Sequence, residues 1–139
     1  MTTLLNNSVE KLVSEITRYI PFKDTTEEGD VVFILNEVNS NQATGNYAQV
    51  ISFSRDNSKR DEWWFVGLVF LTIPVVHYTF ALQTPHFTGR EIFTMGGKKV
   101  FIKAVDTKSF LGKDMKDGRD LGDGQGGAKA GKPSFTLVK

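Results

Sequence analysis

The stretch that most constrains this chain runs from Trp63 to Gln83, WWFVGLVFLTIPVVHYTFALQ, and contains no Asp, Glu, Lys or Arg. It also holds both tryptophans, so any folded core must include it. Two structures are compatible with such a stretch: a membrane span of about 20 apolar residues, or two strands of a soluble core. The choice between them decides what kind of protein this is.

The second half of the stretch alternates in a way that favours strands. From Val76 to Gln83, apolar side chains occupy every second position, and His77 and Thr79 fall on the other face. Pro74 interrupts the run where a connection between strands would fall, because proline has no N–H to donate to a ladder. We therefore expect two strands, with a membrane span over 63–83 as the less favoured alternative.

Composition limits the class of protein. The 139 residues are 40% hydrophobic and 24% charged, as in a soluble single domain. The chain has no Cys, which excludes disulfides and cysteine nucleophiles and suits a reducing compartment, so we expect a cytoplasmic location. A formal net charge of +1 does not favour nucleic-acid binding through phosphate contacts. The N-terminus lacks the basic start and apolar run of a secretory signal.

The flanking segments predict one helix and about six strands. Residues 8–20 have apolar side chains at helical spacing, with Asn7 or Ser8 as the cap and Pro21 as the stop. Alternation in the second strand predicts that Tyr47, Gln49, Ile51 and Phe53 share one face. Loops are expected at 39–46 and 84–89, and strands at 31–38, 47–55, 63–71, 76–83, 90–95 and 98–106.

These elements predict an α+β, mainly β fold. Short connections favour antiparallel pairing, so the N-terminal helix should pack on a small barrel or strongly bent sheet; an α+β sandwich is the alternative. We expect residues 1–106 to form a single globular domain. Seven of the 13 glycines lie in 107–139, where apolar residues are few, so we expect a flexible tail. Residues 134–139 can pair as a short terminal strand.

Three patterns resemble metal or nucleotide sites but lack essential members. Residues 126–132 have the spacing of a phosphate-binding loop, yet Pro133 stands where Ser or Thr should bind magnesium. Aspartates recur at every third position of 114–123 without the order of a calcium loop, and basic residues lie between them. His77 and His86 lack an evident third ligand. We therefore predict no metal, no cofactor and no catalytic residue.

A basic and aromatic cluster provides the tentative binding site: Arg55, Lys59 and Arg60 beside Trp63 and Trp64. Small barrels bind single-stranded nucleic acid with this combination of residues. Three acidic residues within 56–62 dilute the charge, so nucleic acid is an alternative partner and not the favoured one.

The favoured hypothesis is a non-enzymatic protein-interaction or assembly module. Adjacent Trp63 and Trp64 point to opposite faces of a strand, so one can enter the core while the other meets a partner. The run 63–71 is apolar on both faces, and an apolar face not covered within the monomer can meet another chain. We therefore expect self-association through an apolar strand face, with single-stranded nucleic-acid binding and membrane association as alternatives.

Overall fold

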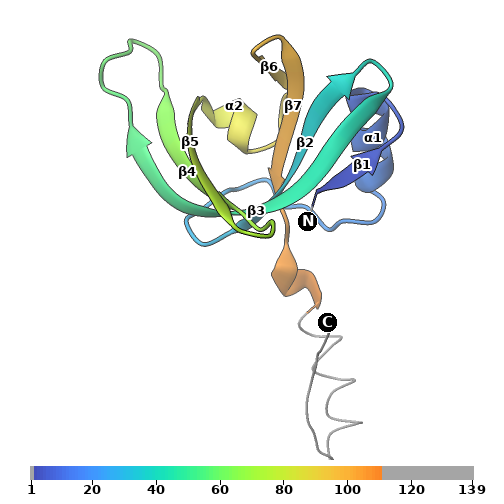
Figure 1. Cartoon of the computed structure of the whole chain (residues 1–139). Coiled ribbons are helices and arrows are strands. Elements are labelled where there is room, and N and C mark those ends of the chain that lie inside the picture. The colour runs from blue at the N-terminus through green and yellow to red at the C-terminus, as the bar shows by residue number, and fades with distance from the viewer. Residues whose placement is uncertain (1, 111–139) are drawn as a thin grey trace, which may run out of the picture. The chain divides into compact units, whose positions relative to one another are not determined.

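A strongly curled antiparallel sheet dominates the computed structural model, which describes residues 2–110 (Figure 1). Across the sheet the strands follow the order β5-β4-β3-β2-β7-β6, and β1 also pairs with β3. The mainly β class, with an N-terminal helix on a strongly bent sheet, is confirmed. The elements in chain order are β1 (Thr3–Leu5), α1 (Val9–Ile16), β2 (Val31–Asn39), β3 (Gln42–Arg55), β4 (Trp64–Phe70), β5 (Val76–Leu82), α2 (Thr84–Phe87), β6 (Phe93–Met95), β7 (Lys98–Ala104) and the 3-10 helix η1 (Thr107–Phe110).

The chain divides into two units after Asp106, and each is described by itself. Of the second unit, η1 is the element that the structure describes. The predicted flexible tail beyond it and the predicted strand at 134–139 lie outside the described residues. The same holds for the phosphate-loop-like and aspartate-rich patterns. The curled sheet and the candidate sites lie within residues 2–106.

The 14-residue strand β3 bends because its two halves pair with different neighbours. Its first half pairs with β2 and β1, and from Ala48 onward it pairs with β4. The register with β4 shifts between Val50 and Ser52, where Ile51 is an extra residue opposite Gly67. Such a bulge bends the strand and increases its twist. A side chain at Gly67 would collide with the Ser52 hydroxyl, so glycine permits this close approach.

Two apolar cores lie on the two faces of the curled sheet. The core on the concave face includes Phe87 of α2, and Figure 1 shows α2 inside the curl. The core on the convex face packs under α1. Strand β2 belongs to both cores: Val32 and Ile34 enter the concave one, and Phe33 and Leu35 the convex one. This explains why the start of β2 is apolar without alternation.

Helix α1 begins where the sequence predicts but ends earlier. The Ser8 hydroxyl oxygen caps it by accepting a first-turn backbone N–H at 3.2 Å. Val9 and Leu12 form the apolar stripe and are buried in the convex core. The helix stops at Ile16 instead of residue 20. The Thr17 hydroxyl donates to a carbonyl of the last turn at 3.0 Å, and such bonds compete with helix continuation.

Two segments predicted as loops belong to regular structure. Most of the predicted loop 39–46 is the start of β3, which pairs with the end of β2 and, over 43–45, also with β1, a strand that the sequence did not reveal. Asn46 is buried there, and its side-chain oxygen accepts a hydrogen bond from the Thr2 hydroxyl at 2.7 Å. The predicted loop 84–89 contains α2, and the strand predicted at 90–95 is reduced to β6.

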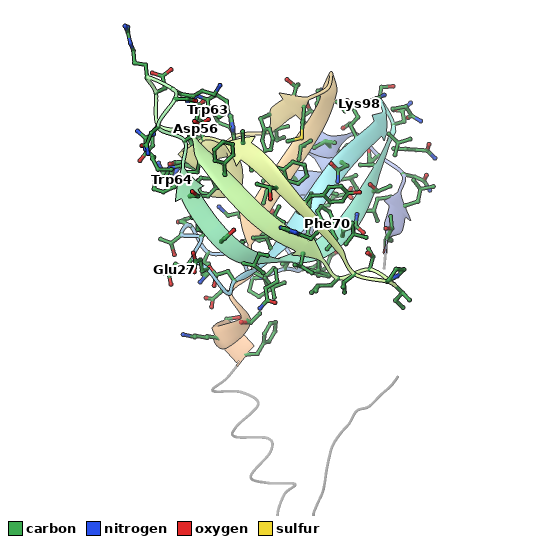
Figure 2. The ribbon with its side chains drawn as sticks, turned by 60° about the vertical axis from the view of Figure 1, so that its left-hand side comes forward. Glu27, Asp56, Trp63, Trp64, Phe70 and Lys98 are labelled. Carbon is green, nitrogen blue, oxygen red and sulfur yellow. The ribbon has the colours of Figure 1, made fainter. Side chains whose placement is uncertain are left out.

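The central charge-free stretch forms the β4–β5 hairpin, with antiparallel pairing from Trp64 with Leu82 to Phe70 with Val76. Figure 2 shows the two tryptophans at one end of this hairpin and Phe70 toward the other. The prediction of two strands is confirmed. Within residues 2–110, no helix combines the length and the apolar character needed to cross a bilayer.

Truncation of the convex core should destabilise the fold strongly. Leu35 is completely buried, so Leu35→Ala should lower the free energy of unfolding by about 2–5 kcal/mol through lost burial and the cavity left behind. Urea denaturation measures this change. Leu4→Ala is the matched control, because Leu4 is exposed on β1 and the expected loss is about 0.5 kcal/mol. Equal losses for the two variants would contradict this account of the core.

Candidate functional site

The tentative binding residues gather at the end of the sheet where β3 leads into β4. Arg55, the last residue of β3, is opposite Trp64, the first residue of β4. Its guanidinium carbon lies 5.9 Å from the centre of the Trp64 ring, a cation–π contact. Trp63 instead makes an edge-to-face contact with His86 of α2, with ring centres 6.0 Å apart. The structure therefore joins Arg55 to Trp64 and gives Trp63 a different neighbour.

The connection between β3 and β4 is organised by Asp56, which is only 6% exposed. One of its carboxylate oxygens accepts hydrogen bonds from the Ser58 hydroxyl at 2.6 Å and the Ser58 N–H at 3.1 Å. The Ser58 hydroxyl bond holds the pKa of Asp56 below its usual range. Lys59 and Arg60 follow as exposed residues. Lys59 and Arg60 thus lie on a surface turn and Trp63 directly precedes β4, so Arg55 and Trp64 are the two members of the site that lie on the sheet.

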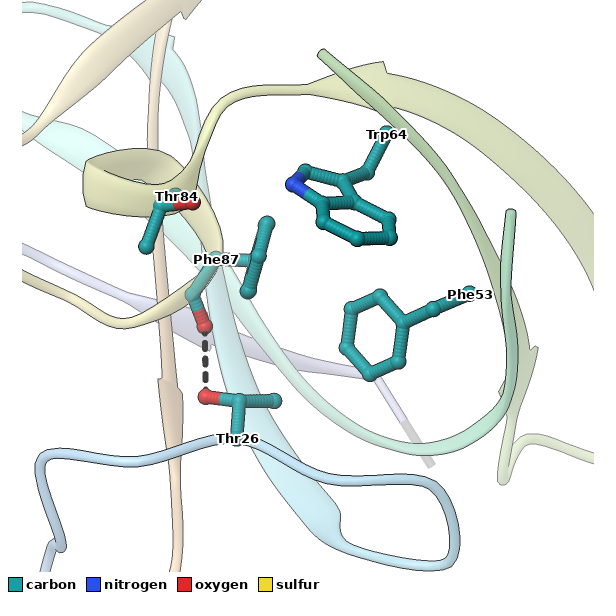
Figure 3. Close-up of a pocket in the computed structure, with 5 residues that line it drawn as sticks. All are labelled: Thr26, Phe53, Trp64, Thr84 and Phe87. Atoms are coloured by element: carbon teal, nitrogen blue, oxygen red, sulfur yellow. Dashed lines mark hydrogen bonds between the residues drawn. The ribbon is translucent and has the colours of Figure 1, made fainter. Parts of the chain in front are cut away.

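Trp64 forms one wall of a pocket of about 240 Å³ between the sheet and α2 (Figure 3). Phe53 and Phe87 are the other aromatic walls. The Phe53 ring centre lies 6.3 Å from that of Trp64 and 5.0 Å from that of Phe87. Thr26 and Thr84 complete the lining. The Thr26 hydroxyl donates to the Phe87 carbonyl at 2.9 Å, which ties the segment before β2 to α2.

The indole N–H of Trp64 is the unusual polar group of this pocket. Its nitrogen is buried and has no hydrogen-bond partner among the described residues. Figure 3 shows this nitrogen turned toward α2, across the pocket. Buried donors in native proteins almost always pair with protein, ordered water or a ligand. The pocket therefore combines apolar walls with one donor for which residues 2–110 provide no acceptor.

Sequence reasoning found Trp64 but missed the other pocket residues. Alternation along β3 predicted Phe53 on the face of Ile51, and this prediction is wrong. The bulge inserts one residue, so side chains after it change faces, and Phe53 packs on the concave core. Phe87 is missing from the sequence prediction because segment 84–89 predicts a loop. Pro85 directly after Thr84 is a helix-start signal that could have placed α2 there.

Strand β5 is the second candidate site, because it is an edge strand with exposed side chains. It pairs with β4, and no strand in the described part of the chain pairs with its other edge. Tyr78 is 52% exposed on this strand. The Tyr78 ring is nearly parallel to that of Phe80, with centres 5.9 Å apart, and lies 5.6 Å from that of Phe70. An aromatic row thus borders an open backbone edge.

Further apolar side chains are exposed around the same hairpin. The connection from β4 to β5 includes Leu71, Ile73 and Val75, all exposed, and Ile73 reaches 86%. On the convex face, Ile51 of β3 and Phe65 of β4 are also exposed. The sequence predicts that β4 is apolar on both faces. Its convex face is therefore only partly covered within residues 2–110.

The two histidines occupy different parts of the fold. His86 stacks on Phe93 with ring centres 4.5 Å apart, and its Nδ1 accepts the Gln83 N–H at 3.2 Å at the start of α2. His77 is exposed on β5, on the face opposite Tyr78. In the part of the chain that the structure describes, no three His, Cys, Asp or Glu residues are grouped so as to hold a metal ion.

Comparison with known protein families, with curated proteins and with solved structures finds no match for this chain. The function must therefore be argued from the site geometry. Two features are available for that argument: the open edge and exposed aromatic row of β5, and the pocket with the indole donor of Trp64.

The environment of His86 should make stability depend on pH. Burial lowers the pKa of His86 from its ordinary value of about 6.5, so the unfolded chain binds this proton more readily than the folded one. The contribution of His86 to stability should therefore decrease as the pH falls below about 6.5 and level off below the folded-state pKa of His86. His86→Gln should reduce this slope in urea denaturation, whereas His77→Gln should keep it. An unchanged slope in His86→Gln would show that the effect arises elsewhere.

Proposed function

We propose that this protein is a non-enzymatic interaction module that associates with a second copy of itself through the β4–β5 hairpin. One observation carries the proposal: β5 is seven residues long, is paired on one edge within the described chain, and has exposed apolar side chains. Such an edge presents backbone N–H and C=O groups that another strand can complete. The cysteine-free composition supports a reducing location such as the cytoplasm.

The contrast between the two edge strands supports this use of β5. Edges that must not pair are usually short, bulged, or protected by Lys or Pro. The edge strand β6 has three residues and pairs with the lysine-rich start of β7. From Val76 to Leu82, β5 contains no Lys, no Pro and no register shift with β4. The usual protection is thus present at one edge and missing at the other.

Antiparallel pairing of two β5 strands around Thr79 gives a well-matched set of side chains. The pairing is isologous, so each copy contributes the same surface. Thr79 then faces its own counterpart, Tyr78 faces Phe80, and Val76 faces Leu82. Cross-strand aromatic pairs favour such an arrangement, and no like charges oppose each other. The exposed Tyr78 ring gains a neighbour from the partner copy.

The hairpin connection can enlarge the same interface. In this antiparallel arrangement, the connection at 71–75 of each copy extends past the end of the other copy's β5. Ile73 and Val75 project from it as exposed apolar side chains. A contiguous exposed apolar surface marks an interaction site more often than a scatter of single residues does. We therefore include this connection in the proposed interface.

Charge substitutions at Thr79 test both the association and its register. Thr79→Lys should produce monomers, because two lysines would lie directly opposite each other at the two-fold axis. Thr79→Glu should do the same. An equimolar mixture of the two variants should restore a dimer, since opposite charges then face each other. Light scattering after size-exclusion chromatography, at high micromolar concentration, measures the mass of each sample.

Thr3→Lys is the matched control, because it introduces the same charge at an exposed threonine of the short strand β1. This variant should remain dimeric. A monomeric wild-type protein, or a Thr79→Lys variant that stays dimeric, would refute the proposal. Dimers lost in both single variants but not recovered in the mixture would refute the register around Thr79.

Single-stranded nucleic acid is the second candidate partner, and the stacking of Arg55 on Trp64 is the observation that favours it. Against it, the acidic residues Asp61 and Glu62 lie in the same turn as Lys59 and Arg60. Salt-dependent binding of a single-stranded oligonucleotide that disappears in Trp64→Ala would favour this candidate over self-association alone.

A further inference from the structure

The pocket of Trp64 has the size and walls for a small ring compound. Its volume of about 240 Å³ lies below the ~300–1,000 Å³ of sites for drug-sized ligands, which suits one ring or two fused rings. The rings of Phe53 and Trp64 meet at 84°, and those of Phe53 and Phe87 at 51°. A planar ligand can therefore place a face on one ring and an edge against another, the two arrangements that aromatic pairs prefer.

The indole N–H of Trp64 specifies a further property of the ligand. This donor is buried without a partner among residues 2–110 and is turned across the pocket toward α2 (Figure 3). A buried donor without an acceptor is costly, so a ligand that brings an acceptor removes that cost when it binds. A ligand that brings a cation would meet the positive end of the N–H dipole. The pocket therefore favours an acceptor such as a carbonyl oxygen or an unprotonated ring nitrogen.

The charges around the pocket disfavour an anion. The Glu28 carboxylate accepts a hydrogen bond from the Phe53 N–H at 3.3 Å, and the Glu62 carboxylate accepts one from the Thr84 hydroxyl at 3.3 Å. Two carboxylates are thus bonded directly to residues that line the pocket, while Arg55 lies over the Trp64 ring. Like charges near a site of low polarity oppose entry of an anionic group.

From these three observations we propose that the Trp64 pocket binds an uncharged one- or two-ring compound whose hydrogen-bond acceptor pairs with the Trp64 indole N–H. The aromatic walls hold the ring, and the N–H fixes its orientation. This pocket is separate from the β5 edge, so the proposal does not depend on self-association. It assigns a role to Phe53 and Phe87, which the tentative site of the sequence did not include.

Two nearly isosteric probes test the role of the N–H: acetophenone, which has a carbonyl acceptor, and ethylbenzene, which has none. The full-length protein labelled with ¹⁵N is titrated with each probe, and the two indole N–H signals are followed by NMR. Acetophenone should shift the Trp64 indole signal in a saturable way. Trp64→Phe keeps an aromatic wall and removes the donor. In this variant the dissociation constant of acetophenone divided by that of ethylbenzene should rise about ten-fold.

Trp63→Phe is the matched control and should leave that ratio unchanged. It also assigns the two indole signals. Benzoate, which adds a negative charge to the same ring, should bind more weakly than acetophenone. The proposal is overturned if neither neutral probe binds, if acetophenone binds without shifting the Trp64 indole signal, or if the ratio is the same in Trp64→Phe. Tighter binding of benzoate would overturn the assignment of an uncharged ligand.

Discussion

The bend of β3 at the bulge between Val50 and Ser52 is the constraint on which the rest of this structure depends. Up to Gln49 β3 pairs with β2, over 43–45 it also pairs with β1, and from Ala48 through the bulge to Arg55 it pairs with β4. Because the strand bends there, the sheet curls and acquires a concave face large enough to hold α2 and a core of its own. Gly67 accommodates the bend, since a side chain there would press on the Ser52 hydroxyl in its present position.

The two candidate sites are consequences of this curl. Within the described chain the sheet curls without closing, so β5 and β6 remain edge strands. The same inserted residue turns Phe53 onto the concave face, where it meets Trp64 and Phe87. A regular β3 would leave Phe53 beside Ile51 on the convex face and would remove one wall of the pocket. A single local irregularity thus positions one wall of the pocket, and the incomplete closure of the sheet leaves the β5 edge open within the described chain.

Polar side chains stabilise this arrangement at the places where regular pairing ends. Thr26 donates to the carbonyl of Phe87, His86 accepts the N–H of Gln83, the residue before α2, and Asp56 accepts two hydrogen bonds from Ser58 in the turn between β3 and β4. The Trp64 indole is the exception, because its N–H is buried without such a partner among residues 2–110. Polar groups left unsatisfied in a native fold are often functional, and here this one faces a pocket.

The sequence by itself determined the elements whose signals are local. Alternation and Pro74 divided the charge-free stretch from Trp63 to Gln83 into two strands, and Ser8 with the apolar stripe located the start of α1. Only the tertiary structure decided what depends on distant partners. The pairing of β2 and β1 with residues 42–46 converts a predicted polar loop into strand, the bulge opposite Gly67 decides which face Phe53 takes, and within the described residues no strand pairs with the outer edge of β5. These are properties of strand pairing, and side-chain periodicity within one strand carries no information about the strand beside it.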